Sequence, residues 1–303
     1  MASNQQLVYT GRFAPTPSGP LHFGSIVAAL ASFLEARLHH GRWLLRIDDL
    51  DTPRIRPGAG DAILKTLELL RLEWDGEVVY QNNRRDAYRL ALNSLMELGL
   101  VYKCYCPRKQ TKGLPYPGTC REYTGKPGKQ FALRIRTDTT PVGFTDSIQG
   151  DCYQDLLGVT GDYIVRRADG VFAYHLAVAV DDAWQGITHI VRGADLLDST
   201  PKQIYLQALL GLPTPAYGHV PVAVDHHDKK ISKRGGAVAA LLDQQPARVL
   251  VEVLQFLGQA VEPGLTKSDT ATVISWAIEN WDISLVPKVR DIQIPTWNPS
   301  QKL

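Results

Sequence analysis

The first hundred residues alternate strand-like with helix-like segments, and this alternation restricts the possible folds more than any other feature of the chain. LVYTGRF (7–13) and RWLLRID (42–48) are typical of strands, and between them apolar residues recur at helical spacing. In order, the pattern predicts strand 7–13, helix 25–39, strand 42–48, a helix that Asp61 caps, strand 77–81 and a helix from Asn82 or Asn83 to Gly99. Because parallel strands need crossover connections, we predict an α/β fold with a mostly parallel sheet and helices packed on it.

A change in composition divides the rest of the chain. Residues 104–130 are rich in Pro, Gly, Lys and Thr and lack periodicity, which indicates an insertion. We then expect strands at 131–137, on both sides of the Ala-Asp-Gly turn in YIVRRADGVFAYHLAV (163–178) and, lastly, at HVPVAV (219–224), with helices at 200–210, 246–257 and 270–281.

Charge and composition exclude several classes of protein. The 33 basic and 31 acidic side chains give a net charge of +2, so any contact with nucleic acid must use a local basic patch. No apolar run is long enough to cross a membrane and no secretory leader is visible, so we expect a cytoplasmic protein without membrane contact, and a monomer. Three of the four cysteines fall within residues 104–120, which in a reducing compartment favours a metal site over disulfides.

The segment RFAPTPSGPLHFGS (12–25) has the features of a phosphate-binding turn. A strand ends, prolines and glycines shape a tight loop, and a helix begins near Ser25. The unpaired N–H groups and the positive dipole end of a helix N-terminus attract phosphate, and His22 lies beside them in sequence. The alternative is that His22 is simply one polar residue in a turn.

A second candidate is DKKISKRGG (228–236), where basic side chains surround Ser232 just after a predicted strand. Such a loop suits the clamping of a polyphosphate, although a solvated basic loop is the alternative.

Together the two segments resemble the signature motifs of class I aminoacyl-tRNA synthetases: LHFGS (21–25) is similar to HIGH and KISKR (230–234) to KMSKS. The resemblance implies that His22 and Lys233 stabilise the α-phosphate of ATP, which binds with Mg²⁺, while an amino-acid carboxylate attacks it. The ATP-binding residues that it implies are Pro15, Ser18, Gly19, His22, Gly24, Ser25, Lys230, Ser232 and Lys233. Ser25 and Arg234 depart from the motifs, standing where the last His and the last Ser would be.

The resemblance also implies a class I synthetase Rossmann-type parallel sheet with an inserted zinc-binding subdomain and a small helical C-terminal region. The four parts that we predict are the first half of the catalytic domain (1–103), the zinc-binding insertion (104–130), the second half with the KISKR loop (131–240) and a helical, stem-contact-like region (241–303).

Further segments resemble the glutamyl and glutaminyl branch, namely RFAPTPSGPLHFGS, LLRIDDLDTPR, FAYHLAVAVDD and VRGADLLDST. The resemblance implies that Arg12 pairs with the side-chain carboxylate of glutamate, that Asp48 holds its α-ammonium, and that Tyr174 and Arg192 complete the pocket. The full set implied is Arg12, Phe13, Ala14, Pro15, Thr16, Asp48, Tyr174 and Arg192. The alternatives are that Arg12 pairs internally with Asp48, Asp49 or Asp51, and that Tyr174 is a core aromatic.

Cys104, Cys106 and Cys120 offer three thiolates, whereas a closed zinc site needs four ligands. No histidine lies between residues 41 and 174, so the fourth ligand within the insertion is Tyr116, Glu122 or Tyr123, or it comes from far away in sequence. Three reduced cysteines in an unstructured insert are the alternative.

The 69 residues after Arg234 are too few for the anticodon-binding domains of an ordinary glutamyl-tRNA synthetase. With the cysteine cluster, this shortness resembles the bacterial family of glutamyl-Q tRNA(Asp) synthetases, in which tyrosine is the unusual fourth zinc ligand, here Tyr116. That resemblance implies tRNA-independent activation of L-glutamate and its transfer to the queuosine base in the anticodon stem-loop of tRNA(Asp). Basic residues that could contact the RNA stem are Arg134, Arg136, Arg166, Arg167, Lys229 and Arg234. The rival functions are a compact glutamyl-tRNA synthetase that charges the tRNA 3′ end and a zinc-bearing RNA-binding module with a degenerate core.

Overall fold

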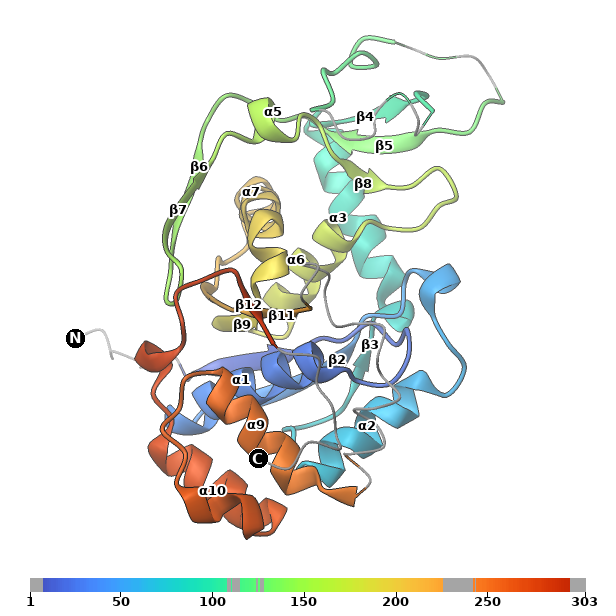
Figure 1. The fold of residues 1–303 in the computed structure, drawn as a ribbon. Helices are drawn as coiled ribbons and strands as arrows, with labels where there is room; N and C mark the ends of the chain where they lie inside the picture. Colours follow the sequence, from blue (N-terminus) through green and yellow to red (C-terminus); the bar gives the residue numbers. More distant parts are fainter. Residues whose placement is uncertain are drawn as a thin grey trace, which may run out of the picture.

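The computed structural model describes residues 8–107, 110, 115–123, 125, 128–225, 242 and 244–294. The predicted KISKR loop therefore lies outside the described residues. Figure 1 shows the central strands and helices α1, α6 and α7, with the insertion at one end of the molecule and helices α9 and α10 at the other.

The centre of the fold is parallel sheet, as predicted. Strands β1 (Thr10–Phe13), β2 (Arg42–Ile47) and β3 (Val79–Tyr80) pair in parallel in that order. A second sheet has the order β7 (Gly150–Gln154), β6 (Val142–Asp146), β10 (Ala216–Val220) and β9 (His189–Gly193), and only its β6–β7 hairpin is antiparallel. The two sheets meet at β1, where the Thr188 N–H donates to the Thr10 carbonyl at 2.9 Å.

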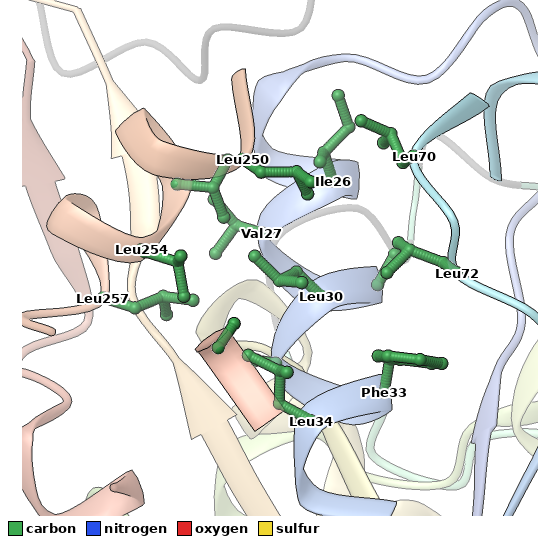
Figure 2. Packing of buried hydrophobic residues seen from close by; sticks show 14 of the residues in the cluster. Ile26, Val27, Leu30, Phe33, Leu34, Leu70, Leu72, Leu250, Leu254 and Leu257 are labelled. Carbon is green, nitrogen blue, oxygen red and sulfur yellow. The ribbon is translucent and has the colours of Figure 1, made fainter. Parts of the chain in front are cut away.

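Helix α1 (Phe23–Leu38) forms the core on one face of this sheet. Eleven of its 16 residues are buried, so it is covered on nearly every side. Figure 2 shows its apolar side chains between those that follow α2 (Ala59–Leu69) and those of α9 (Pro246–Phe256), and α10 (Thr270–Asn280) packs against both α1 and α9. This packing fixes the start of α1, and with it the loop that carries His22.

The opposite face is covered by α3 (Arg85–Glu97), α6 (Tyr174–Trp184) and α7 (Thr200–Leu210). Strand alternation explains how a buried arginine reaches this face: along β2, Trp43, Leu45 and Ile47 pack with α1, whereas Leu44 and Arg46 lie on the other side and Arg46 contacts α6.

The insertion connects two strands of a small antiparallel sheet. Its strands are β4 (Val101–Cys104), β5 (Ala132–Ile135) and β8 (Ile164–Arg166), and the short helix α5 (Leu156–Val159) follows the β6–β7 hairpin.

Three predictions of secondary structure are wrong. The second extended run in 163–178 is helix α6, in which residues 176–179 are all buried, so that the helical period is hidden. The segment 219–224 forms two strands, because Pro221 has no N–H and separates β10 from β11 (Val222–Val224). Nor is it the last strand of the chain, since β11 pairs with a later strand, β12 (Asp291–Gln293). The caps also differ: α1 begins at Phe23 after His22, and α2 follows Gly58, whose φ is +73°, so Asp61 lies within the first turn.

In the part of the chain that the structure describes, no helix combines the length and the apolarity needed to cross a membrane.

Candidate functional site

The loop between β1 and α1 places His22 at the helix N-terminus. His22 is the N-cap: its Nδ1 accepts from the Ser25 N–H at 3.3 Å, and its Nε2 lies 3.1 Å from the Ser25 hydroxyl. Ser25 therefore contacts the motif histidine and is not itself the cap. The arrangement brings an imidazole to the positive end of a buried helix, which is the geometry expected for a phosphate site.

Neighbouring backbone bonds hold this loop in place. The Asp48 N–H donates to the Pro15 carbonyl at 2.9 Å, and the Arg56 N–H donates to the Pro17 carbonyl at 2.9 Å. The predicted ATP contacts in residues 15–25 thus belong to one anchored turn, and Asp48 lies beside it. The other predicted contacts, Lys230, Ser232 and Lys233, lie outside the described residues.

Arg12 does pair internally, but with an aspartate from α6. Its Nε and Nη2 lie 3.3 and 3.4 Å from Oδ1 and Oδ2 of Asp182, and both side chains are buried. The pKa of Asp182 is lowered, since burial would raise it but the charges of Arg12 and Arg46 outweigh that effect. The sequence alternative was wrong about the partner, and Arg12 remains a predicted glutamate contact.

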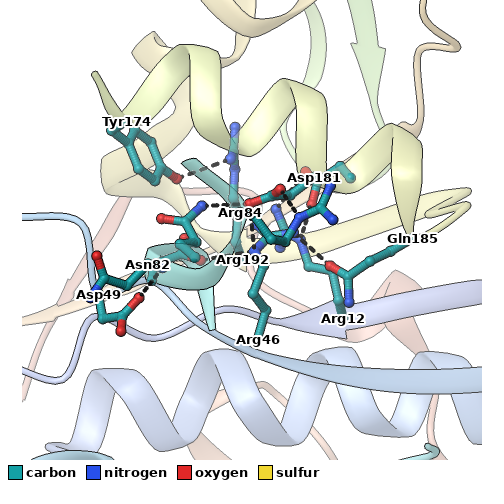
Figure 3. Close-up of polar contacts among 12 residues, drawn as sticks. Arg12, Arg46, Asp49, Asn82, Arg84, Tyr174, Asp181, Gln185 and Arg192 are labelled. Atoms are coloured by element: carbon teal, nitrogen blue, oxygen red, sulfur yellow. Dashed lines mark hydrogen bonds and ion pairs between the residues drawn. The ribbon is translucent and has the colours of Figure 1, made fainter. Parts of the chain in front are cut away.

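Arg46 connects the two predicted amino-acid contacts on this side of the pocket. It donates from Nε to Asp48 Oδ1 at 2.8 Å and from Nη1 to Asp182 Oδ1 at 2.7 Å. Figure 3 shows Arg12, Arg46, Asp181 and Gln185 meeting between helix α6 and the strands below it. Arg46 and Asp182 were not predicted as site residues, although an arginine inside an apolar strand and a pair of aspartates at the end of an apolar helix are both visible in the sequence.

The two carboxylate oxygens of Asp48 differ in their hydrogen bonding. Its side chain is buried, Oδ1 accepts from Arg46, and Oδ2 has no hydrogen-bond partner among the described residues. Burial raises the pKa of Asp48 to about 6. A buried acceptor without a donor is costly unless a ligand satisfies it, so Oδ2 is suited to a cationic group.

Tyr174 and Arg192 are brought together, as the resemblance implied. Arg192 Nη1 lies 3.5 Å from the Tyr174 hydroxyl, and Figure 3 shows this contact at the start of α6. The other Arg192 donors go to neutral acceptors: Nη2 to Thr200 Oγ1 and Gln203 Oε1, each at 2.8 Å, and Nε to His219 Nε2 at 3.1 Å. Arg192 is 4% exposed, so its charge faces no carboxylate in these contacts.

A cavity of 1340 Å³ opens beside Asp48 and Tyr174, whereas Arg12, His22 and Arg192 are not among its described lining residues. Its lining includes Asp48 and Tyr174, the basic side chains of Arg54, Arg167 and Lys202, and Cys104, Cys106 and Tyr116 of the insertion. Ordinary small-molecule pockets measure about 300–1000 Å³, so the cavity has room for more than one amino acid.

The three predicted thiols do come together. The Sγ atoms of Cys104, Cys106 and Cys120 all lie within 4.8 Å of one another, and the Tyr116 hydroxyl lies 3.4 Å from the Sγ of Cys104 and of Cys106. Tetrahedral Zn–S bonds of about 2.3 Å place ligand atoms about 3.8 Å apart, so this donor set fits one zinc ion.

The packing around Tyr116 explains why its ring is fixed. The Arg134 guanidinium lies 3.9 Å above the ring, and the Tyr116 backbone bridges to Gly161. A Cβ at Gly161 would lie 2.1 Å from the Tyr116 carbonyl oxygen, so only glycine allows this approach. Arg134 itself is 6% exposed and lies on the cavity lining, so its contact with RNA phosphates stays a prediction.

Comparison with known proteins assigns this geometry to a class of enzyme. The family described as tRNA synthetases class I (E and Q), catalytic domain, matches residues 8–264, and the chain belongs to it. The protein is therefore a ligase of the class I aminoacyl-tRNA synthetase type.

More particularly, the chain belongs with the glutamyl-Q tRNA(Asp) synthetases. It is 48% identical over 297 residues to that of Dechloromonas aromatica (95% of this chain, 98% of the relative) and 49% identical over 286 residues to that of Ectopseudomonas mendocina (94% and 97%). It is also 50% identical over 275 residues to that of Pseudomonas putida (90% and 92%).

Solved structures confirm the fold. A glutamate tRNA ligase from Elizabethkingia meningosepticum, in complex with its amino acid, aligns with a TM-score of 0.78 and 22% identity, over 94% of this chain and 66% of that one. The glutamate-tRNA synthetase of Elizabethkingia anophelis aligns with a TM-score of 0.80 and 21% identity, over 95% and 68%. This chain thus spans about two thirds of each larger protein.

Proposed function

We propose that this protein activates L-glutamate with ATP and Mg²⁺, without needing tRNA, and transfers the glutamyl group to the queuosine base of tRNA(Asp). In the first step a glutamate carboxylate oxygen bonds to the α-phosphorus of ATP while the bond to pyrophosphate breaks. In the second step a queuosine hydroxyl attacks the acyl carbon, the bond to AMP breaks, and the hydroxyl proton is lost to solvent.

The observation that carries the proposal is a pair of buried groups of opposite charge: Asp48 lines the cavity, and Arg192 contacts Tyr174, which also lines it. Within the described part of the chain, Arg192 is a buried cation that donates to neutral acceptors, and Asp48 is a buried acid whose Oδ2 has no hydrogen-bond partner. The first suits a carboxylate and the second suits an ammonium group, so the pair suits an amino acid. That this amino acid is glutamate is proposed from the relatives, which are glutamyl-Q tRNA(Asp) synthetases.

His22 supports the activation step from the other side of the loop. As the N-cap of α1 it lies where a phosphate would meet the helix dipole, and together with Lys233 it would stabilise charge on the α-phosphate.

The acceptor is proposed from the cavity and from the relatives. The glutamyl-Q tRNA(Asp) synthetases match nearly the whole length of this chain, and the cavity with its basic lining can admit a nucleoside beside the amino acid. We propose that the anticodon stem-loop enters here and that the protein acts as a monomer, with the four-part division into 1–103, 104–130, 131–240 and 241–303.

We also propose that Cys104, Cys106, Tyr116 and Cys120 hold a structural zinc ion. The ion would crosslink the insertion where it lines the cavity. Its role would be structural, because four protein ligands leave no open position for a substrate.

Two assays test the proposal. Glutamate-dependent exchange of pyrophosphate into ATP without tRNA tests activation, and its absence would favour the RNA-binding module. Transfer of labelled glutamate is then measured with tRNA(Asp) carrying queuosine, the same tRNA without it, and unmodified tRNA(Glu). We expect labelling of the first alone; labelling of tRNA(Glu) would instead establish a compact glutamyl-tRNA synthetase.

A further inference from the structure

A row of three buried side chains crosses the sheet beneath the candidate pocket. His219 on β10 is the register partner of Arg192 on β9, and Asp146 ends β6 on the other side of β10. Their exposed fractions are 0% for His219, 2% for Asp146 and 4% for Arg192. Water therefore cannot satisfy these groups, and each polar atom must find its partner within the row or in its neighbours.

The direction of each hydrogen bond in this row is fixed by chemistry. Arg192 Nε carries a hydrogen and can only donate, so His219 Nε2, 3.1 Å away, must be the acceptor. The Thr200 hydroxyl also lies 3.1 Å from this nitrogen, and it donates to the Leu196 carbonyl at 3.2 Å. The proton of the neutral ring is then on Nδ1, which donates to Asp146 Oδ2 at 2.5 Å. Burial lowers the pKa of His219, which is consistent with a neutral ring.

The two oxygens of Asp146 have separate partners. Oδ1 accepts three backbone N–H groups, those of Ile148, Gln149 and His219, at 3.1, 2.9 and 3.0 Å. Oδ2 accepts from the His219 ring. One oxygen thus shapes the turn after β6, and the other sets which ring nitrogen of His219 is protonated.

We propose that Asp146 and His219 are positioning residues for substrate recognition: Asp146 selects the His219 tautomer whose Nε2 accepts from Arg192, and this bond aims the guanidinium at the substrate carboxylate. A neutral imidazole between the two charges also separates Asp146 from Arg192. The guanidinium therefore keeps its attraction for a ligand anion, which a directly paired carboxylate would reduce. This inference rests on the proposed activation of glutamate.

The substitution Asp146→Asn replaces a single heavy atom of this row, the Oδ2 oxygen, by a nitrogen. The Asn carbonyl oxygen can keep the three backbone bonds, whereas its NH₂ group replaces Oδ2 and can only donate to His219 Nδ1. The ring must then carry its proton on Nε2, which faces the Nε–H of Arg192, donor against donor, and can donate only to Thr200 Oγ1, 3.1 Å away, so that the bond from Arg192 is lost. We expect the glutamate KM in pyrophosphate exchange to rise about tenfold or more, with the ATP KM within about twofold of the wild-type value.

His219→Gln is the matched variant. An amide separates its two polar atoms by about the same distance as the two ring nitrogens, so its oxygen can accept from Arg192 while its NH₂ donates to Asp146. We expect the glutamate KM to rise less than about threefold. A purely structural role predicts the reverse order, because Asp146→Asn preserves shape and His219→Gln loses ring volume, and that order would overturn the proposal.

Nitrogen-15 NMR of labelled histidine gives a readout that does not depend on activity. We expect the His219 signal, assigned by its loss in His219→Gln, to report the Nδ1–H tautomer in the wild type and the Nε2–H tautomer in Asp146→Asn. An Nε2–H signal in the wild type would overturn the proposal. If the wild-type protein shows the Nδ1–H tautomer but no glutamate-dependent exchange, the proposed function fails, whereas the assigned directions of the hydrogen bonds remain correct.

Discussion

Arg12 on strand β1 and Asp182 on helix α6 form a buried two-point ion pair, with N–O distances of 3.3 and 3.4 Å, across 170 residues of sequence. Arg46 joins the same carboxylate at 2.7 Å. Asp182 is therefore shared by two guanidinium groups, of which Arg46 also pairs with Asp48.

Replacement of Asp182 by Ala should destabilise the protein strongly. The change leaves Arg12 and Arg46 buried without this partner, and breaking a buried pair on one side costs about 3–5 kcal/mol. Urea unfolding followed by circular dichroism measures the loss. The control is Asp86→Ala, which removes an 85% exposed carboxylate paired with Arg89 and should cost less than about 1 kcal/mol. Equal losses in the two variants would contradict the importance of the buried pair.

Glutamate binding should weaken as the pH falls through about 6. Burial raises the pKa of Asp48 to about 6, and only the ionised carboxylate attracts the substrate ammonium, which stays protonated throughout this range. The glutamate KM in pyrophosphate exchange should rise toward about tenfold per pH unit below that value, while the ATP KM follows no such course. In Asp48→Asn the glutamate KM should be high and nearly independent of pH. A wild-type KM that stays constant from about one pH unit below this pKa to about one unit above it would rule out this role.

The raised pKa of Asp48 also predicts how the free energy of unfolding depends on pH. Because the folded-state pKa of Asp48 lies above its unfolded value, the folded protein binds the proton more tightly. The contribution of Asp48 to the free energy of unfolding should therefore increase as the pH falls from about 6 to about 4. Asp182 should contribute in the opposite direction, because its lowered pKa stabilises the folded protein at neutral pH.

Tyr116→Phe should lower the affinity for zinc by about tenfold or more, because it removes the oxygen that lies 3.4 Å from two of the thiols. Competition with a coloured chelator measures the affinity. Tyr123→Phe is the matched control: that side chain is 49% exposed and stacks edge-on against Tyr105, so zinc should be retained. Indistinguishable affinities in the two variants would show that Tyr116 is not a ligand.

His22 can be tested so that capping and catalysis separate. His22→Ala removes the N-cap acceptor and should cost about 1 kcal/mol of stability, whereas His22→Asn supplies a good cap and should cost little. Both should lower kcat for pyrophosphate exchange about 100-fold or more, since neither provides an imidazole near the α-phosphate. Thermal unfolding and exchange assays measure the two effects. Normal exchange by His22→Asn would leave His22 with a capping role only.

The sequence predicted the parallel sheet, the core helix and the main motifs, because these depend on local periodicity. The run of apolar residues from 26 to 38 favours a helix in any context, and the spacing of Cys104, Cys106 and Cys120 already indicated a metal site. Tyr174 and Arg192 were also assigned to one pocket from the motifs that they occupy, and the structure places them 3.5 Å apart.

The errors arose where burial removed the periodic signal. Helix α6 is apolar on several sides, so its pattern resembled a strand, and the two strands around Pro221 looked continuous until proline's missing N–H separated them.

The sequence by itself determined which residue types were available: a histidine before a buried helix, acidic and basic residues near strand ends, and clustered thiols. Only the tertiary structure decided the partners. Arg12 met Asp182 rather than a neighbouring aspartate, and Arg192 met His219, because strand alternation turns these side chains to the α6 face, where no water competes. Pairing across distant segments depends on register and burial, which only the folded chain provides.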